Sequence, residues 1–178
     1  MTTKLKFSAP EVNQALDRLA RAIVKAHGST PDLIFVGVAD GGIGLVQRLA
    51  EKVGESLGQK ISLGIVDVSF HRDDIGSNPI PKAAVPTDLP PEVEGSSCIL
   101  VDDVIFSGRT IRAALNELFD QGRPECVELA VLVDRGHRRL PFSPDYAGIE
   151  LGTTLEQNVE VLVGPTHPLD DHVTVTPL

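Results

Sequence analysis

The sequence predicts an α/β protein with a central, mainly parallel sheet flanked by helices. Short continuous apolar runs alternate along the chain with segments whose apolar residues recur at helical spacing. The apolar runs suit strands that are buried on both faces of a parallel sheet. With 178 residues, 42% of them hydrophobic, the chain fits one domain with a sizeable core.

The first half of the chain predicts two helices around one strand. SAPE at Ser8–Glu11 resembles a capping box, and apolar residues recur at helical spacing from Val12 to Val24, before Gly28. The run LIFVGV, Leu33–Val38, predicts a buried strand. A glycine-rich loop, ADGGIG, leads from it into a helix marked by Leu45–Val53.

The middle of the chain repeats the strand and helix alternation. We expect strands at Ile61–Phe70, at about Ser97–Val101 and at Cys126–Val133, and a helix over Ile111–Leu118 that ends near Gly122. Such an alternation implies right-handed crossovers between parallel strands. A long segment rich in Pro, Gly and Asp separates the first two of these strands, and such loops are usually functional or disordered.

The remaining chain from Asp134 is turn-rich. Short β runs at Asn158–Val163 and Val173–Val175 predict a small extra subdomain. Cys98 and Cys126 lie in apolar runs, so we interpret both as buried thiols in a reducing compartment.

Composition excludes some classes of function. The net charge of −9 argues against a generally basic nucleic-acid binder, although a local basic patch is compatible with it. No apolar run approaches the roughly 18 residues of a membrane span, and the N-terminus lacks the apolar core of a signal peptide. We therefore expect a cytoplasmic protein without a membrane partner.

The stretch CILVDDVIFSGRT carries the clearest chemical signal. A buried strand runs into two adjacent carboxylates, Asp102 and Asp103, at the strand end where open parallel sheets bind ligands. Vicinal ribose hydroxyls are natural donors to such a pair. The alternative is a solvated strand end followed by an ordinary helix cap.

The residues after the acidic pair predict an anion site. The turn from Val104 to Arg109 leads into a helix that begins near Thr110, and backbone N–H groups at a helix start attract phosphate. Ser107 and Thr110 can add hydroxyl donors, and Gly108 allows close backbone approach. A sugar phosphate satisfies both halves of the site, and Mg²⁺ is a natural companion because it favours few carboxylates plus substrate phosphates.

This stretch resembles the phosphoribosyl diphosphate (PRPP) motif of type I phosphoribosyltransferases. Together with VDVSFHRDD and GRPECVELAVLVDRGHRRLPFSPDYAG, it is similar to the PyrR family, whose members regulate pyrimidine operons and act as uracil phosphoribosyltransferases. The aromatic Phe106 favours this subfamily. The resemblance covers nearly the whole chain. It implies one type I phosphoribosyltransferase domain over 1–178, a mobile loop at about 71–95, a hood at about 135–178, and a homodimer or higher homo-oligomer.

The resemblance also implies a set of site residues. Asp102 and Asp103 would hold the ribose hydroxyls of PRPP or of the product nucleotide. Arg72 would act catalytically on the pyrophosphate side, next to Asp73 and Asp74; the alternative is a surface ion pair with one of these two carboxylates. The implied ribose 5-phosphate site adds Val104, Phe106, Ser107, Gly108, Arg109 and Thr110, and the implied base side comprises Asp134, Arg135 and His137. His137 is equally compatible with a structural turn.

The implied reaction transfers ribose 5-phosphate from PRPP to uracil and gives UMP and pyrophosphate. Positioning, stabilisation of the leaving group by Mg²⁺ and Arg, and exclusion of water would carry the catalysis. The resemblance implies Mg²⁺ that is bound through PRPP, without direct protein ligands.

The implied pyrophosphate loop departs from the family pattern. Ala39, Asp40 and Gly41 stand where Lys, Thr and Arg are typical, and Gly42 follows. One misplaced unit charge ~4 Å from a diphosphate costs on the order of 4 kcal/mol at an effective dielectric constant of 20. A backbone anion nest from Gly41 and Gly42 would compensate in part. We therefore expect PRPP binding to suffer more than UMP binding.

A second departure concerns RNA, which the regulatory members bind as a messenger leader. Asp17 stands where Thr is typical, and Ile149, Glu150 and Glu156 stand where lysines are common. Lost cations weaken phosphate contacts directly. Three hypotheses follow: a uracil phosphoribosyltransferase, a UMP-sensing RNA-binding attenuator, and a nucleotide-binding homologue with weak or no catalysis.

Overall fold

The computed structural model describes residues 5–39, 41–68, 86–166 and 168–178. Its centre is a five-stranded sheet in the order β3-β2-β4-β5-β6, in which every neighbouring pair is parallel. The strands are β2 (Leu33–Val38), β3 (Ser62–Val66), β4 (Ser97–Ile105), β5 (Cys126–Asp134) and β6 (Tyr146–Glu150). The predicted α/β fold with a mainly parallel sheet is confirmed.

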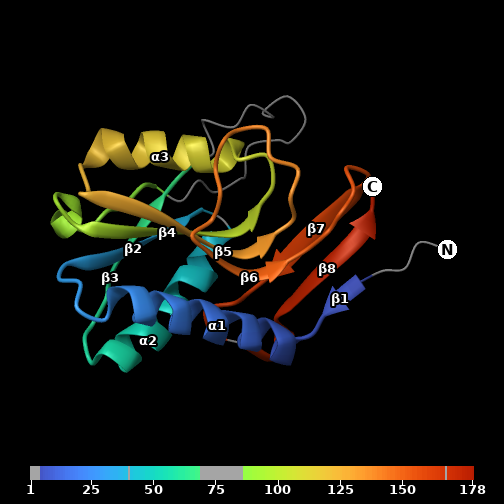
Figure 1. Cartoon of the computed structure of the whole chain (residues 1–178), viewed down its shortest axis with the longest axis horizontal. Helices are drawn as coiled ribbons and strands as arrows, with labels where there is room; N and C mark the ends of the chain where they lie inside the picture. The colour runs from blue at the N-terminus through green and yellow to red at the C-terminus, as the bar shows by residue number, and fades with distance from the viewer. Residues whose placement is uncertain (1–4, 40, 69–85, 167) are drawn as a thin grey trace.

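Helices cover both faces of this sheet (Figure 1). Helix α1 (Ala9–His27) and helix α2 (Gly42–Leu57) lie together on one face, and α3 (Arg109–Gln121) lies on the other. Short 3₁₀ turns, η1 (Pro91–Val93) and η2 (Pro168–Asp170), complete the helical elements of the described chain. Each face has its own apolar cluster, one built around Phe35 and Leu49 and the other around Leu100 and Leu118. The carboxyl ends of the parallel strands, where the sequence predicts the ligand site, thus lie between two packed layers.

A smaller antiparallel sheet lies beside the main one. Its order is β1-β8-β7, with β1 (Leu5–Phe7), β8 (His172–Pro177) and β7 (Gln157–Leu162). The extreme N-terminal strand therefore pairs with the C-terminal one (Figure 1). Tyr146–Glu150 lies within the segment expected to form the hood, yet it is the fifth strand of the main sheet.

The sequence predicted most element positions, with informative differences. LIFVGV forms β2 at the predicted bounds, and Glu11 accepts a hydrogen bond from the Ser8 N–H as the capping box requires. The strand expected at about Ser97–Val101 is β4, which is longer than predicted and continues to Ile105. The prediction that Cys126 is buried is wrong: Cys98 is buried, but Cys126 starts an element at the rim of the sheet and is exposed.

Membrane insertion finds no support among the described helices. Each of them is too short or too polar to cross a bilayer.

Candidate active site

The acidic pair lies inside strand β4, not at its end. The β4–β5 ladder continues past it, with Asp102 opposite Val131 and Val104 opposite Val133. Asp102 is buried, and one of its carboxylate oxygens accepts the Asp103 N–H at 3.0 Å. The pattern of apolar residues misplaced the strand end because two adjacent carboxylates interrupt the apolar run without interrupting the backbone ladder.

Asp103 packs directly against the start of helix α2. Its Oδ1 accepts the Val104 N–H at 2.7 Å, and burial raises the pKa of its carboxyl group although that N–H opposes the shift. A Cβ built on Gly41 would overlap the Asp103 Cγ and Oδ2 and would lie 2.9 Å from Oδ1. The Gly41–Gly42 part of the predicted pyrophosphate loop and the predicted ribose carboxylate therefore form one surface.

A short turn follows β4 and opens helix α3. Gly108 is the residue before the helix, with φ +89°, a conformation that favours glycine. A Cβ on Gly108 would also meet the Phe142 ring at 3.0 Å. The Ser107 hydroxyl accepts the Arg109 N–H at 3.3 Å, and Thr110 is half-buried in the first helical turn. The structure thus brings the predicted phosphate residues together at a helix N-terminus.

The carbonyl groups of Ile105, Phe106 and Ser107 accept hydrogen bonds from the β5–β6 loop, residues 135–145. Ile105 O accepts the Arg135 N–H at 3.2 Å, and Ser107 O accepts two N–H groups of the loop at 2.9 and 3.0 Å. In a trans peptide, the carbonyl of one residue and the N–H of the next point in opposite directions. The N–H groups that follow these carbonyls therefore point away from the loop, toward the open side of the turn.

Three peptide N–H groups are oriented this way, those of Phe106, Ser107 and Gly108. Within the described ranges, none of them donates to another protein group. Successive N–H groups that converge beside a helix N-terminus form a concave anion site. The predicted phosphate cradle therefore has a geometric basis.

The three predicted base-side residues lie next to this turn but are engaged with the protein. The Arg135 guanidinium lies 4.4 Å from the Phe106 ring centroid and donates to the carbonyls of Thr154 and Gln157. Its burial lowers the pKa of Arg135. His137 has φ +61°, lies edge-on to the Phe106 ring with 6.3 Å between the ring centroids, and places its Nε2 2.6 Å from the Thr153 carbonyl oxygen.

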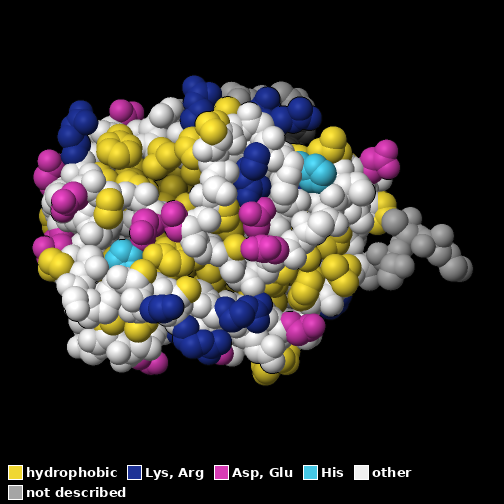
Figure 2. Space-filling model, in the orientation of Figure 1, with side chains coloured by type: hydrophobic (Ala, Val, Ile, Leu, Met, Phe, Trp, Pro, Cys, Tyr) yellow, Lys and Arg dark blue, Asp and Glu magenta, His cyan; other side chains and the backbone are white. Residues whose placement is uncertain are grey.

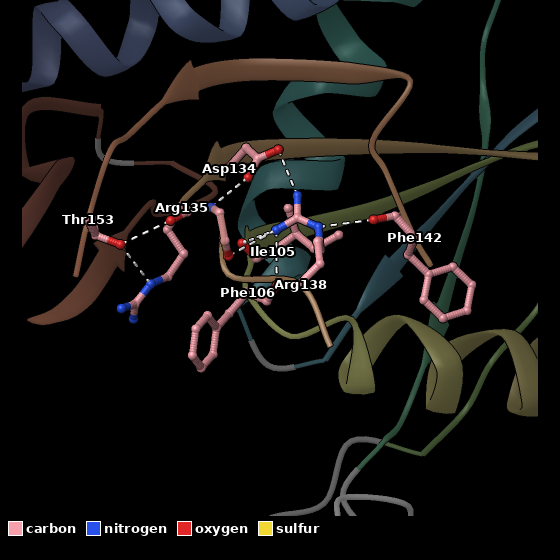
Figure 3. A network of polar contacts seen from close by, with 8 residues as sticks. Ile105, Phe106, Asp134, Arg135, Arg138, Phe142 and Thr153 are labelled. Atoms are coloured by element: carbon pink, nitrogen blue, oxygen red, sulfur yellow. Dashed lines mark hydrogen bonds and ion pairs between the residues drawn. The ribbon is translucent and has the colours of Figure 1, made fainter. Parts of the chain in front are cut away.

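Arg138 is a neighbour that sequence reasoning missed. Its Nη2 contacts Asp134 Oδ2 at 2.6 Å, and its other nitrogens donate to backbone carbonyls (Figure 3). The signal was present as an Asp and an Arg four residues apart. Outside a helix, however, that spacing does not predict a contact, because only helical geometry places such residues on one face.

Some predicted residues lie outside the described ranges. These are Asp40 of the pyrophosphate loop, the catalytic candidate Arg72, and its neighbours Asp73 and Asp74. The described remainder of the irregular segment includes one bridge to the sheet edge, between Asp88 and Ile65.

Metal-ligand clusters are absent from the described part of the chain, where no group of three or more His, Cys, Asp or Glu side chains converges. Asp102 and Asp103 remain as an adjacent carboxylate pair. Such a pair fits a site beside Mg²⁺ that takes its ligands from a phosphorylated substrate and from water.

Comparison with known proteins decides the family. Residues 7–166 match the phosphoribosyl transferase domain family. A protein of Chloroflexus aurantiacus named bifunctional protein PyrR is 40% identical over 168 residues, covering 94% of this chain and 92% of its own. The chain belongs to the PyrR family of phosphoribosyltransferases. Another member, from Streptomyces coelicolor, is 44% identical over 156 residues, covering 87% of this chain and 80% of its own.

Solved structures agree on the fold. A hypoxanthine phosphoribosyltransferase of Trypanosoma cruzi superimposes with a TM-score of 0.70 at 19% identity, covering 97% of this chain and 95% of its own. One from Staphylococcus aureus gives a TM-score of 0.64 at 18% identity, over 85% and 78% of the two chains. The predicted type I phosphoribosyltransferase fold and PyrR membership are confirmed.

Proposed function

We propose that this PyrR-family chain transfers ribose 5-phosphate from PRPP to uracil, with UMP and pyrophosphate as products. One observation carries the proposal: an acidic pair on β4 is followed by a turn at the start of α3 with three successive peptide N–H groups that donate to no other described protein group. Ribose hydroxyls would donate to Asp102 and Asp103, while the 5-phosphate would accept from the turn. Uracil as the base follows from membership of the PyrR family, whose members act as uracil phosphoribosyltransferases.

The reaction is a displacement at C1 of the ribose. The bond from C1 to the pyrophosphate oxygen breaks, a bond from C1 to N1 of uracil forms, and the N1 proton passes to solvent. Positive charge develops on the sugar ring as the leaving group departs, and the buried acidic pair would stabilise that charge electrostatically. Fixing both ends of the sugar also removes much of the entropic cost of alignment.

Mg²⁺ would neutralise the pyrophosphate charge in the bound substrate. PRPP would bring it into the site with phosphate and hydroxyl ligands, beside the Asp102–Asp103 pair. The chain's own task is to orient the sugar, and Arg72 is proposed to assist on the pyrophosphate side.

A base panel tests the proposal directly. Purified protein is incubated with PRPP, Mg²⁺ and one base at a time: uracil, cytosine, hypoxanthine, guanine or xanthine. We expect UMP and pyrophosphate to form from uracil alone. Turnover of hypoxanthine in place of uracil, or of no base at all, would refute the assignment.

A mutational check tests the location of the sugar. Asp102→Asn combined with Asp103→Asn should abolish the rise in Tm that UMP gives, because amides cannot replace two anionic acceptors. Asp120→Asn, an exposed carboxylate on α3, is the matched control. A full UMP-dependent shift in the double variant would place the nucleotide elsewhere.

A second candidate is nucleotide binding with little turnover. The described residues of the pyrophosphate loop, Ala39, Gly41 and Gly42, have no cationic side chain, and Asp103 occupies the space in front of Gly41. This arrangement favours a monophosphate over a diphosphate. The candidate predicts a UMP-dependent rise in Tm without UMP synthesis, whereas steady turnover excludes it.

An RNA-binding role is favoured by one surface feature. Arg18, Arg21 and Lys25 are exposed along one side of α1, in a chain whose overall charge is −9. In Figure 2, Lys and Arg side chains gather over the position of α1. Arg18 also donates to the Gly148 carbonyl at 2.7 Å, which holds it in place. We propose that this stripe would contact the phosphates of a messenger leader.

Salt dependence tests this role. A stem-loop RNA from a pyrimidine-operon leader is titrated at several salt concentrations, with and without UMP. The binding constant K falls as salt rises. Arg21→Gln with Lys25→Gln should make the slope of log K against log salt less steep, by roughly 0.7–0.9 per lost phosphate contact. Lys60→Gln, an exposed cation outside α1, should leave the slope unchanged. Absence of binding at low salt would exclude the role.

A further inference from the structure

We propose that Arg138 is a positioning residue for the 5-phosphate site. Its guanidinium holds the carbonyl groups of Ile105 and Phe106, where strand β4 leads into the turn before α3, so that the N–H groups of the same peptides face the phosphate. The inference rests on the proposed function, because it assigns the turn as the phosphate-binding half of that site. Arg138 itself would not touch the substrate.

The guanidinium uses all three of its nitrogens within the protein (Figure 3). Nη1 lies 3.3 Å from Ile105 O and 3.0 Å from Phe106 O, so one group holds two successive carbonyls of the turn. The remaining contacts anchor the side chain to its own loop: Nη1 to Gly136 O at 3.2 Å, Nε to Phe142 O at 3.0 Å and Nη2 to Asp134 Oδ2 at 2.6 Å.

This anchoring explains how Arg138 can set a backbone conformation. The Asp134 carboxylate accepts from Arg138 through one oxygen and from the Gly136 N–H through the other at 2.9 Å. The side chain of Arg138 is only 21% exposed. A planar fork fixed on two sides presents its donors to the turn with little loss of freedom on ligand binding.

The consequence for the phosphate follows from peptide geometry. If a turn peptide rotates by half a turn about its axis, its carbonyl and its N–H exchange places. The cradle would then present an oxygen to the phosphate where it had presented a donor. The peptide between Phe106 and Ser107 would rotate most easily without Arg138, because Arg138 is the only described residue that donates to the Phe106 carbonyl.

Among the described residues, backbone N–H groups hold the carbonyls on either side of Phe106 but not the Phe106 carbonyl itself. The N–H groups of Arg139 and Leu140 hold the Ser107 carbonyl, and the Arg135 N–H holds that of Ile105. A lysine has a single nitrogen and lacks the fork, so it could reach one carbonyl while losing the bond to Phe142 O. We therefore expect an order of effect: arginine best, lysine intermediate, methionine worst.

Ribose 5-phosphate, UMP and uridine are the probes that separate phosphate binding from base binding. Binding is followed by amide chemical shifts for the native chain, for Arg138→Met, for Arg138→Lys and for the control Arg123→Met, an exposed arginine at the far end of α3. We expect Arg138→Met to raise the Kd of ribose 5-phosphate and of UMP at least tenfold. The Kd of uridine should change less than twofold, and Arg138→Lys should recover part of the loss.

Each result bears on the inference separately from the proposed function. An equal loss for UMP and uridine, or an unchanged Kd for ribose 5-phosphate, overturns the positioning role, as does a native chain that does not bind ribose 5-phosphate. If Arg138→Met fails to fold, Asp134→Asn, which keeps Arg138 but weakens its anchor, must raise the same two Kd values at least threefold. Failure to make UMP from uracil and PRPP refutes the enzyme assignment alone, because the ribose 5-phosphate titration needs neither the base nor pyrophosphate.

Discussion

Gly41→Ala would show how tightly the proposed pyrophosphate loop packs against Asp103, the proposed ribose carboxylate. Gly41 has φ −67° and ψ −31°, a helical conformation that alanine adopts without strain. The whole cost is therefore steric, because the new Cβ would overlap the carboxyl group of Asp103. That side chain would have to rotate and give up the Val104 N–H, which it holds at 2.7 Å.

The expected magnitude combines two opposing effects. Loss of a hydrogen bond to a charged group costs about 1.5–3 kcal/mol. Replacement of glycine by alanine at a compatible position stabilises by about 0.4–1 kcal/mol through the unfolded chain. The net loss of unfolding free energy is about 1–2 kcal/mol, or a fall in Tm of about 3–6 °C for its middle value in a chain of this size.

A double-mutant cycle isolates the contact. In the Asp103→Ala background the overlap disappears, so Gly41→Ala should become stabilising by about 0.4–1 kcal/mol. Because the chain has no Trp and one Tyr, unfolding in urea is followed by far-ultraviolet circular dichroism. Gly152→Ala, where a Cβ meets nothing within 4 Å, is the control and should not destabilise. The same destabilisation by Gly41→Ala in both backgrounds would refute the reasoning.

Two further predictions concern buried charges. Burial raises the pKa of Asp103 above its ordinary 3.8. The Asp103 carboxyl group therefore adds to the free energy of unfolding at pH values below 3.8, and this stabilisation is lost as pH rises through the pKa of the folded state. Asp103→Asn should therefore make the ligand-free protein more stable at pH 7.5 but not at pH 3.5, as measured by urea unfolding; a variant less stable at pH 7.5 would contradict this. Arg48 and Asp171 form a buried ion pair between α2 and the segment before β8, and the Asp171 side chain is 0% exposed. Arg48→Met should cost about 3–5 kcal/mol, because it leaves a buried carboxylate unpaired, and adding Asp171→Asn should recover most of the loss; equal stability of the single and double variants would argue against the pair.

Local patterns account for the parts of the fold that were predicted well. A capping box and helical spacing define α1, and an uninterrupted apolar run defines β2 at its observed bounds. Strand β6 was missed because its alternation is weak and its partner, β5, is fixed only by folding. The exposure of Cys126 was missed for a related reason: an apolar run does not reveal which of its ends reaches the rim of the sheet.

The candidate site likewise has a part that the sequence predicted and a part that only the structure revealed. The acidic pair, the turn and the start of α3 are contiguous in the sequence, so their donors and acceptors could be predicted from residue order alone. The sequence by itself thus determined the family, and it predicted the ribose 5-phosphate motif. Only the tertiary structure decided what supports the motif: Arg138 lies 33 residues beyond Ile105, and Gly41 lies against Asp103 from another element. Such contacts depend on which carbonyls and side chains the folded sheet brings together, and residue order does not specify that.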